Sequence, residues 1–427
     1  MGILSSMYTG ITGLQGQGEA LAIYGDNIAN ANTVGFKVSR PEFQDVIAKS
    51  LKGLLGGNQI GRGVRLAAVN PIFSQGSIIQ TESSTDLAIT GDGFFVMNGI
   101  DGRSFSRNGA FHFDKDGKLI NADGYKIQGF QADDRGKMTS KMGDISVDRT
   151  VVDAKKTSEV NLFMNLDLRA DKNLQFDPNR PDQTSHFATG MTVYDTAGTA
   201  HTVTAYFNKA DDGIWQWRVM AKGEEVQNGK KGAMVEQASG RLIFDTDGRM
   251  KEQITDRSSF QFNKGALPDQ AIKFNFGPDK RGGGDGLQVT QYGTGSEAYK
   301  TTQDGYTAGT LAGLTFNDDG ILAAMYTNGQ SMNLAQVALA KFENPEGMFK
   351  MGQNRFRESR LSGQPTVGSP ETGGRGRVSS KTIESSTTDI ANEFINLMSA
   401  QRNFQANAKV ISTGDEMMQD VLNIKRN

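Results

Sequence analysis

Large apolar residues recur at alternating steps of three and four at both ends of the chain, which predicts an α-helix at each end. Near the N-terminus the repeated positions are Leu4, Met7, Ile11, Leu14, Gly18, Leu21, Gly25 and Ile28. Near the C-terminus they are Ile390, Phe394, Leu397, Gln401, Phe404, Ala408, Ile411, Asp415, Met418 and Leu422, of which Gln401 and Asp415 are polar breaks in the pattern. Such residues share one helix face, and an apolar face needs another helix to cover it. We therefore predict a helical core of residues 1–29 and 386–427 that neighbouring subunits complete.

The N-terminal pattern contains glycines that weaken a helix, at Gly10, Gly13, Gly16, Gly18 and Gly25. Each costs up to about 1 kcal/mol relative to alanine. Two interpretations are open: a poorly formed tail, or a helix that forms on assembly, where glycine lets another helix approach closely. The regular spacing favours the helix. The C-terminal helix is better specified, because the serine, threonine and aspartate residues of 385–389 supply N-cap candidates.

Between the two predicted helices, short apolar runs alternate with polar residues and are bounded by Gly and Asn. Examples are GDGFFVM (91–97), HTVTAYF (201–207) and IWQWRV (214–219), all typical of β-strands. The pattern of 76–150 returns at 303–360, so we predict a first β domain from these two segments and an inserted outer β domain of residues 151–302. Residues 30–75 and 361–385 are predicted to be extended arms or hinges. The fold class is mainly β with terminal α-helices and nested β domains.

A short repeat with Asp-Gly at its centre occurs three times, as FDKDGKL (113–119), FDTDGRM (244–250) and FNDDGIL (316–322). Glycine at a hairpin tip readily takes the positive φ that other residues resist. A calcium loop of the EF-hand type requires glutamate at position 12, which is Tyr125 when counted from Asp114. The repeat therefore predicts β-hairpin tips rather than calcium sites.

Composition narrows the functional classes. The 427 residues predict two to four domains, and 52 glycines beside 9 prolines favour many tight turns. A net charge of −2 gives no footprint for nucleic acid. The absence of cysteine excludes disulfides and thiol chemistry. No apolar run approaches the ~20 residues that span a bilayer, and the start MGILSSMY is unlike a cleaved signal peptide.

Candidate catalytic or metal-binding groups are sparse. His112, His186 and His201 form neither an HxH nor an HExxH pair, so we predict no catalytic residue, metal or cofactor. Trp215 and Trp217 lie two residues apart on one strand face. They permit two interpretations, packing within a sheet or a stacking platform for sugars, and packing is favoured.

Three segments carry motifs in a fixed order along the chain. They are NIANANTVGFK (27–37), GDGFFVM with GAFHFDKDGKLINADGYKIQGF (91–130), and DIANEFINLMSAQRNFQANAKVIST (389–413). Together they resemble the bacterial flagellar axial proteins that build the rod and hook. The residues that match the N-terminal signature of this family are Asn27, Asn30, Asn32, Gly35 and Phe36.

Within that family, the length of the chain, MTVYDTAGTAHTVTAYF (191–207) and NPEGMFKMGQNRF (344–356) resemble the hook members rather than the shorter rod members. The resemblance implies a non-enzymatic subunit of a flexible tube outside the cell, which joins rod to filament, transmits torque and forms part of the export channel. It implies a homopolymer whose partners are the hook cap, distal rod and hook–filament junction proteins, and export by the flagellar type III apparatus without a cleaved signal peptide. No nucleic acid or membrane insertion is expected.

The inner helices and outer β domains are expected to make different contacts. Permanent apolar contacts suit the helices, whereas wetter contacts that slide suit outer domains that must move as a tube bends. Two other functions stay open: a distal-rod protein, and a secreted β protein that binds glycans.

Overall fold

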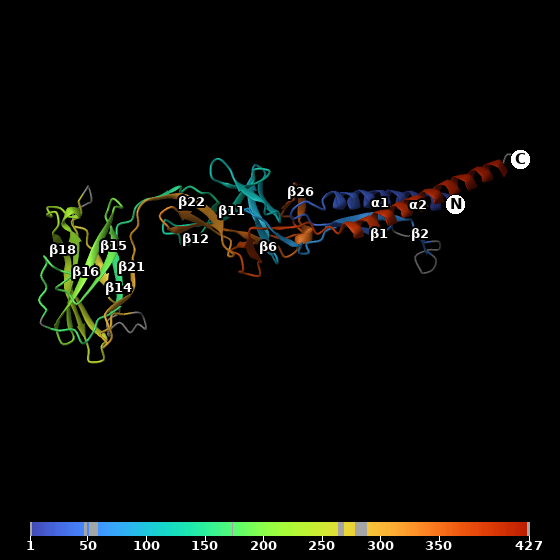
Figure 1. Cartoon of the computed structure of the whole chain (residues 1–427). Coiled ribbons are helices and arrows are strands. Elements are labelled where there is room, and N and C mark those ends of the chain that lie inside the picture. The colour runs from blue at the N-terminus through green and yellow to red at the C-terminus, as the bar shows by residue number, and fades with distance from the viewer. Residues whose placement is uncertain are drawn as a thin grey trace. The chain divides into compact units, whose positions relative to one another are not determined.

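The structure is a computed structural model that describes residues 2–46, 49–50, 59–172, 174–263, 269–277 and 288–424. The chain divides into two compact units (Figure 1). Unit 1 contains residues 1–148, 313–325 and 331–427, and unit 2 contains residues 149–312 and 326–330. The prediction of a mainly β protein with a helix at each end is confirmed.

The two terminal helices are α1 (Gly2–Ala29) and α2 (Ile390–Ile424). Asp389 caps α2, since its Oδ1 accepts the backbone N–H groups of Ala391 at 3.0 Å and Asn392 at 3.2 Å. This satisfies N–H groups that have no partner inside the helix. Neither helix, within the described residues, is long and apolar enough to cross a membrane.

Unit 1 is built around one antiparallel sheet with the strand order β23-β24-β11-β7-β8-β27-β26. Its N-terminal strands are β1 (Ser39–Asp45), β2 (Lys49–Ser50), β3 (Gln59–Ile60), β4 (Val64–Pro71), β5 (Ile78–Gln80), β6 (Leu87–Thr90), β7 (Phe94–Gly99), β8 (Gly102–Ser106), β9 (Phe111–Phe113), β10 (Leu119–Asn121), β11 (Lys126–Ala132) and β12 (Met138–Asp144). The strands of the returning chain, together with the 3-10 helix η2, are β23 (Ile321–Tyr326), β24 (Ser331–Val337), β25 (Leu339–Lys341), η2 (Pro345–Gly347), β26 (Phe349–Gly352), β27 (Arg355–Arg357), β28 (Thr366–Gly368), β29 (Arg377–Ser380) and β30 (Thr382–Glu384).

The segments predicted to be extended arms contain paired strands. In 30–75, β1 pairs antiparallel with β4 from Ser39 opposite Pro71 to Asp45 opposite Val64. In 361–385, β28 pairs with β25, β29 with β6, and β30 with β5. The described parts of both segments are therefore fixed by backbone hydrogen bonds instead of running free, because extended chain beside another edge satisfies its N–H and C=O groups by pairing.

Unit 2 contains a five-stranded antiparallel sheet, β15-β16-β17-β18-β19, and a three-stranded sheet, β20-β14-β21. Its elements are β13 (Val151–Val152), β14 (Glu159–Asn165), β15 (Phe187–Tyr194), β16 (Ala200–Asp211), β17 (Ile214–Lys222), η1 (Gly223–Glu225), β18 (Met234–Phe244), β19 (Met250–Ser258), β20 (Lys273–Asn275), β21 (Glu297–Gln303) and β22 (Gly309–Phe316), the last of which continues into unit 1.

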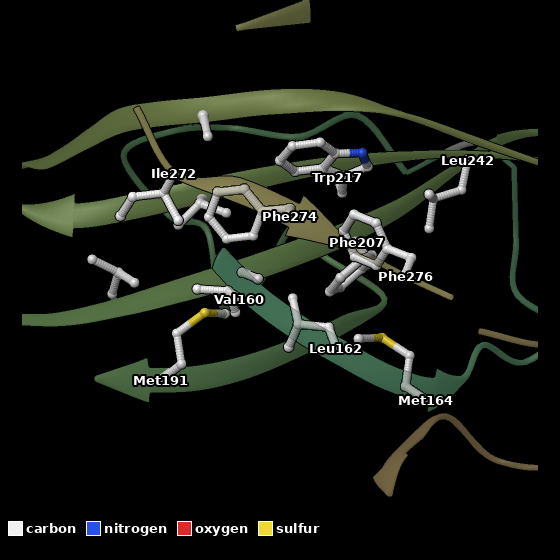
Figure 2. Packing of buried hydrophobic residues seen from close by; sticks show 14 of the residues in the cluster. Val160, Leu162, Met164, Met191, Phe207, Trp217, Leu242, Ile272, Phe274 and Phe276 are labelled. Carbon is white, nitrogen blue, oxygen red and sulfur yellow. The ribbon is translucent and has the colours of Figure 1, made fainter. Parts of the chain in front are cut away.

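One apolar core holds the two sheets of unit 2 together. Figure 2 shows Val160 and Leu162 of β14 packed near Phe207 and Trp217 of the larger sheet. The ring centroids of Trp217 and Phe276 lie 5.3 Å apart. Period-two alternation in the sequence produces this core, because it places every second residue of a strand on the same face.

A single type of turn links many of the hairpins. Among the described residues, Asp114, Asn121, Asp133, Asp195, Asp245 and Asn317 each accept the backbone N–H groups two and four residues further on. The glycine three residues on has a φ between 70° and 82°, as at Gly320 and Gly124. The three predicted hairpin tips are confirmed, and there are three further copies, of which those at Asp133 and Asp195 lack the Asp-Gly pair.

Candidate assembly surface

The terminal helices pack against each other in antiparallel orientation. Met7, near the start of α1, lies against Gly414 near the end of α2. At the opposite end of the pair, Asn27 Nδ2 donates to Glu393 Oε2 at 3.0 Å. Part of the apolar surface of each helix is thus covered within the subunit.

Small residues, more than large ones, allow the close approach of the helices. A Cβ added at Gly13 would lie 2.7 Å from the Asn407 side chain, and one at Gly414 would lie 2.8 Å from Met7. By contrast, no atom lies within 4 Å of a Cβ added at Gly18. Some glycines of α1, such as Gly13, therefore lie in the contact with α2, whereas Gly18 has no neighbouring atom within the subunit.

The structure divides the predicted helical positions into half-buried and exposed residues. The half-buried ones are Met7, Leu14, Leu21, Ile28, Leu397, Phe404, Ile411 and Met418. The exposed ones are Leu4 (51% exposed), Ile11 (39%), Ile390 (48%), Phe394 (49%) and Leu422 (60%). On α2 the half-buried residues follow one heptad position and face α1 together with the buried Ala400 and Gly414. The exposed set is the part of the predicted surface that remains available to another chain.

Further apolar residues of the helices lie outside the positions that repeat at steps of three and four. Tyr8 on α1 and Ile395, Met398, Val410, Met417 and Val421 on α2 are exposed. Many exposed large apolar side chains on one pair of helices indicate contacts with other molecules. We call these residues, together with the exposed predicted positions, the helical apolar surface.

The family-signature residues lie where α1 meets the β-strands. Asn27 is fully buried: its Nδ2 donates to Ser39 O at 2.8 Å, and its Oδ1 accepts the N–H of Ser39 at 2.9 Å. Asn30 Nδ2 donates to Asp26 Oδ1 at 3.0 Å. Gly35 and Phe36 are buried, whereas Asn32 is exposed. These residues close the end of α1 and direct the chain into β1.

A buried ionic cluster beside this signature was not predicted. Lys37 Nζ lies 2.7 Å from Glu384 Oε1, and Arg107 Nη1 lies 3.4 Å from Glu384 Oε2. Burial lowers the pKa of Lys37 although Glu384 opposes that shift, and burial lowers the pKa of Arg107 in the same way. Lys37 ends the signature motif, but no local pattern connects it with a carboxylate 347 residues away.

Two tryptophans and one histidine that were considered as candidate binding or catalytic groups are packed in the interior of the fold. Trp215 and Trp217 are fully buried, so sheet packing is the correct interpretation. His201 stacks on Phe262 at 3.9 Å, with its two ring nitrogens 3.1 Å from Asp195 and from Glu225. Within the described part of the chain, no three His, Asp or Glu side chains are arranged to hold a metal ion.

Family models match most of the chain in consecutive segments. The matching descriptions are flagellar basal body rod protein (residues 7–37), flagellar hook protein FlgE/F/G D1 domain (88–160), flagellar basal body protein FlaE D2 domain (165–306) and flagellar basal body rod FlgEFG protein C-terminal (379–424).

Alignments with similar proteins cover nearly the whole chain. The flagellar hook protein FlgE of Treponema pallidum (strain Nichols) is 31% identical, and the match covers 99% of this chain and 100% of the relative. The FlgE of Escherichia coli (strain K12) is 30% identical, covering 97% and 98%. The crystal structure of Helicobacter pylori flagellar hook protein FlgE2 matches with a TM-score of 0.53 at 13% identity, covering 72% of this chain and 100% of that one. At this identity the structural match supports the fold alone.

Proposed function

The chain belongs to the flagellar hook protein FlgE family, and from this membership we propose that it is the structural subunit of a bacterial flagellar hook. The observation that carries the proposal is the helical apolar surface, on which residues such as Phe394 and Leu422 are about half exposed. Leaving such a surface in water is unfavourable, whereas packing against another copy removes it from water. A contact that does not close on itself generates an open helical polymer.

In the proposed polymer, the terminal helices form the inner wall of a tube and the β units face outward. Helical contacts are apolar and permanent, because they exclude water from the helical apolar surface. Contacts between outer β domains are wetter and slide, so that the tube bends as a universal joint while it transmits torque. The lumen of the tube serves as part of the export channel.

We further propose which molecules this subunit meets. A hook cap protein directs its polymerisation, a distal rod protein receives the first copies, and a hook–filament junction protein follows the last. Export runs through the flagellar type III apparatus to the outside of the cell. The role is mechanical, so the proposal involves no catalysis, cofactor or nucleic acid.

Two other functions are less well supported. A distal-rod protein would form straight tubes, so the curvature of the polymer distinguishes it from a hook protein. A glycan-binding function rested on Trp215 and Trp217 as a stacking platform, and both side chains are fully buried. Without an exposed aromatic pair, that function loses its motivating observation.

The proposal is tested by polymerising the purified full-length chain and examining it by electron microscopy. We expect curved tubes from the wild type and none from Phe394→Asp, because a carboxylate in a desolvated helical contact is strongly unfavourable. The matched control is Ile100→Asp, which places the same charge at a fully exposed hairpin tip of unit 1. Tubes from Phe394→Asp in normal yield, or a wild type that never polymerises, would contradict the proposal.

A further inference from the structure

The side chain of Glu384 joins three segments of unit 1. Its Oε1 accepts a hydrogen bond from Lys37 Nζ, which follows α1, and another from the Gly76 N–H, which precedes β5, both at 2.7 Å. Its Oε2 lies 3.4 Å from Arg107 Nη1, on the chain after β8. Glu384 itself ends β30, six residues before α2 begins at Ile390. One carboxylate therefore connects the exit of α1, the entry of α2 and the first sheet.

The three charged side chains of this cluster are withdrawn from water. Relative exposure is 0% for Glu384, 1% for Lys37 and 4% for Arg107. Lys37 Nζ also donates to Ser74 O at 2.5 Å, and Arg107 Nη2 donates to Gly91 O at 2.7 Å. With two cations and one anion, the cluster depends on the anion, because removing it leaves two buried cations without a counter-charge.

The backbones at this junction are also in direct contact. Gly35 has a φ of 68°, and a Cβ there would lie 2.6 Å from the Arg107 carbonyl carbon. Its N–H donates to Glu384 O at 2.7 Å. A Cβ at Gly76 would lie 2.3 Å from Ser385 O. No space separates these segments, so a shift of one against another requires breaking the hydrogen bonds of the cluster.

Independent contacts fasten the same segments on either side of the cluster. Thr387 N–H donates to Phe36 O at 3.2 Å, and Val38 N–H donates to Thr387 Oγ1 at 3.0 Å. Asn27 joins the end of α1 both to Ser39 and to Glu393 of α2. Hydrogen bonds between residues distant in sequence thus continue from the helices into the strands.

We propose that the Lys37–Glu384–Arg107 cluster is a clasp that fixes the helical pair to the first β sheet, with Glu384 as its positioning residue. The helices and this sheet then turn as one rigid body, and torque passes between them without a hinge. The inference rests on the proposed role as a hook subunit. It removes residues 34–39 and 384–389 from the regions where hinge movement is expected, so bending must take place elsewhere.

Hydrogen–deuterium exchange of the full-length chain, in solution and in tubes, tests the clasp. In the wild type, amides of Gly35, Gly76 and Ser385 should exchange as slowly as those of the buried strand β7. In Glu384→Gln the same amides should exchange at least about tenfold faster, since the two cations lose their counter-charge. Lys37→Met should have a smaller effect than Glu384→Gln, because it leaves one cation paired with the anion.

The control is Glu343→Gln, which removes the charge of an exposed glutamate in the same unit and should leave exchange unchanged. Fast exchange at the junction of the wild type, or equal exchange in Glu384→Gln and wild type, would overturn the clasp even if tubes form normally. Conversely, slow exchange at the junction of a wild type that never polymerises would reject the proposed function and leave the clasp intact as a structural feature. The two ideas are therefore judged by different measurements.

Discussion

The terminal helices of unit 1 and the two packed sheets of unit 2 differ in how far their large apolar side chains are buried. In unit 2, Trp215, Trp217 and Phe276 are fully buried between two sheets of the same chain. In the helices, Phe394 and Leu422 remain about half exposed although each helix already has a partner. Unit 2 has a core that is buried within one chain, whereas the helical pair has apolar surface to bury against another molecule.

Glycine sharpens this contrast. In unit 2, glycines such as Gly198 and Gly248 take positive φ at turns, so they serve the fold of the subunit itself. In α1, Gly13 permits contact with α2, but Gly18 contacts nothing within 4 Å of its absent side chain. Helical glycine normally reduces stability. Its presence without a partner in the subunit agrees with a role in packing against neighbouring copies.

Deleting residues 1–28 should have the largest effect on assembly and should leave unit 2 unchanged. We expect complete loss of tube formation, because α2 loses its partner and the helical apolar surface is no longer built. The thermal transition of unit 2 should not change, since its core lies in residues 160–289. Electron microscopy and calorimetry of the same sample measure both. Tubes from the truncated chain, or loss of the unit 2 transition, would show that the two regions do not differ as described.

Trp217→Ala should have the next largest effect, in the opposite region. Removing a fully buried tryptophan costs about 3–5 kcal/mol of unfolding free energy, so the unit 2 transition should fall to a much lower temperature. Denaturant unfolding measures the loss of unfolding free energy, and calorimetry measures the fall in transition temperature. Tyr299→Ala in β21 is the control: this side chain is 57% exposed, and its loss should change stability by no more than about 0.5 kcal/mol. Equal losses in the two variants would mean that unit 2 lacks a dominant core.

The sequence allowed prediction of features that depend on local spacing. Period-two alternation located the strands around Trp217, heptad spacing located both helices, and Asp389 lay among the predicted N-caps. It did not reveal the clasp, because Glu384 and Lys37 meet only after residues 347 positions apart are brought together. It identified part of the contact face of α2, since predicted positions such as Ile411 face α1, but it did not identify Gly414, because hydrophobic periodicity detects large residues and not small ones.

A pair of glycine substitutions in α1 distinguishes contact within the subunit from free surface. Gly13→Ala should destabilise the helical pair by about 1 kcal/mol, because its methyl group displaces the Asn407 side chain, whose Nδ2 donates to Asn403 O, and this loss outweighs the gain in helix propensity. Gly18→Ala should stabilise the isolated subunit by up to about 1 kcal/mol, because its methyl group meets no atom. Thermal loss of the far-UV circular dichroism signal of the helices measures both. The same sign for both variants would contradict the assigned faces of α1.

The dependence of stability on pH tests whether unit 2 is stabilised by contacts within its own chain. Burial raises the pKa of Asp304, but hydrogen bonds from Ser158 and Glu159 and the ammonium of Lys155 outweigh it, so the pKa lies well below its ordinary value. A carboxyl with a lowered folded-state pKa stabilises the fold above its unfolded pKa of about 4, and this stabilisation is lost as pH falls toward the folded value.

We therefore expect Asp304→Asn to destabilise unit 2 by about 1–2 kcal/mol at neutral pH, with the difference from wild type shrinking steadily as the pH falls below about 4. Denaturant unfolding of monomeric protein at several pH values measures the difference. Asp256→Asn is a suitable comparison, because Asp256 is paired only at the surface with Arg241 at 3.4 Å, where an ion pair contributes little. A difference that stayed constant with pH would mean that the charge of Asp304 is not what stabilises this turn. The dependence should be the same in monomers and in tubes, because unlike the helical pair, unit 2 gains its stability from contacts within one chain.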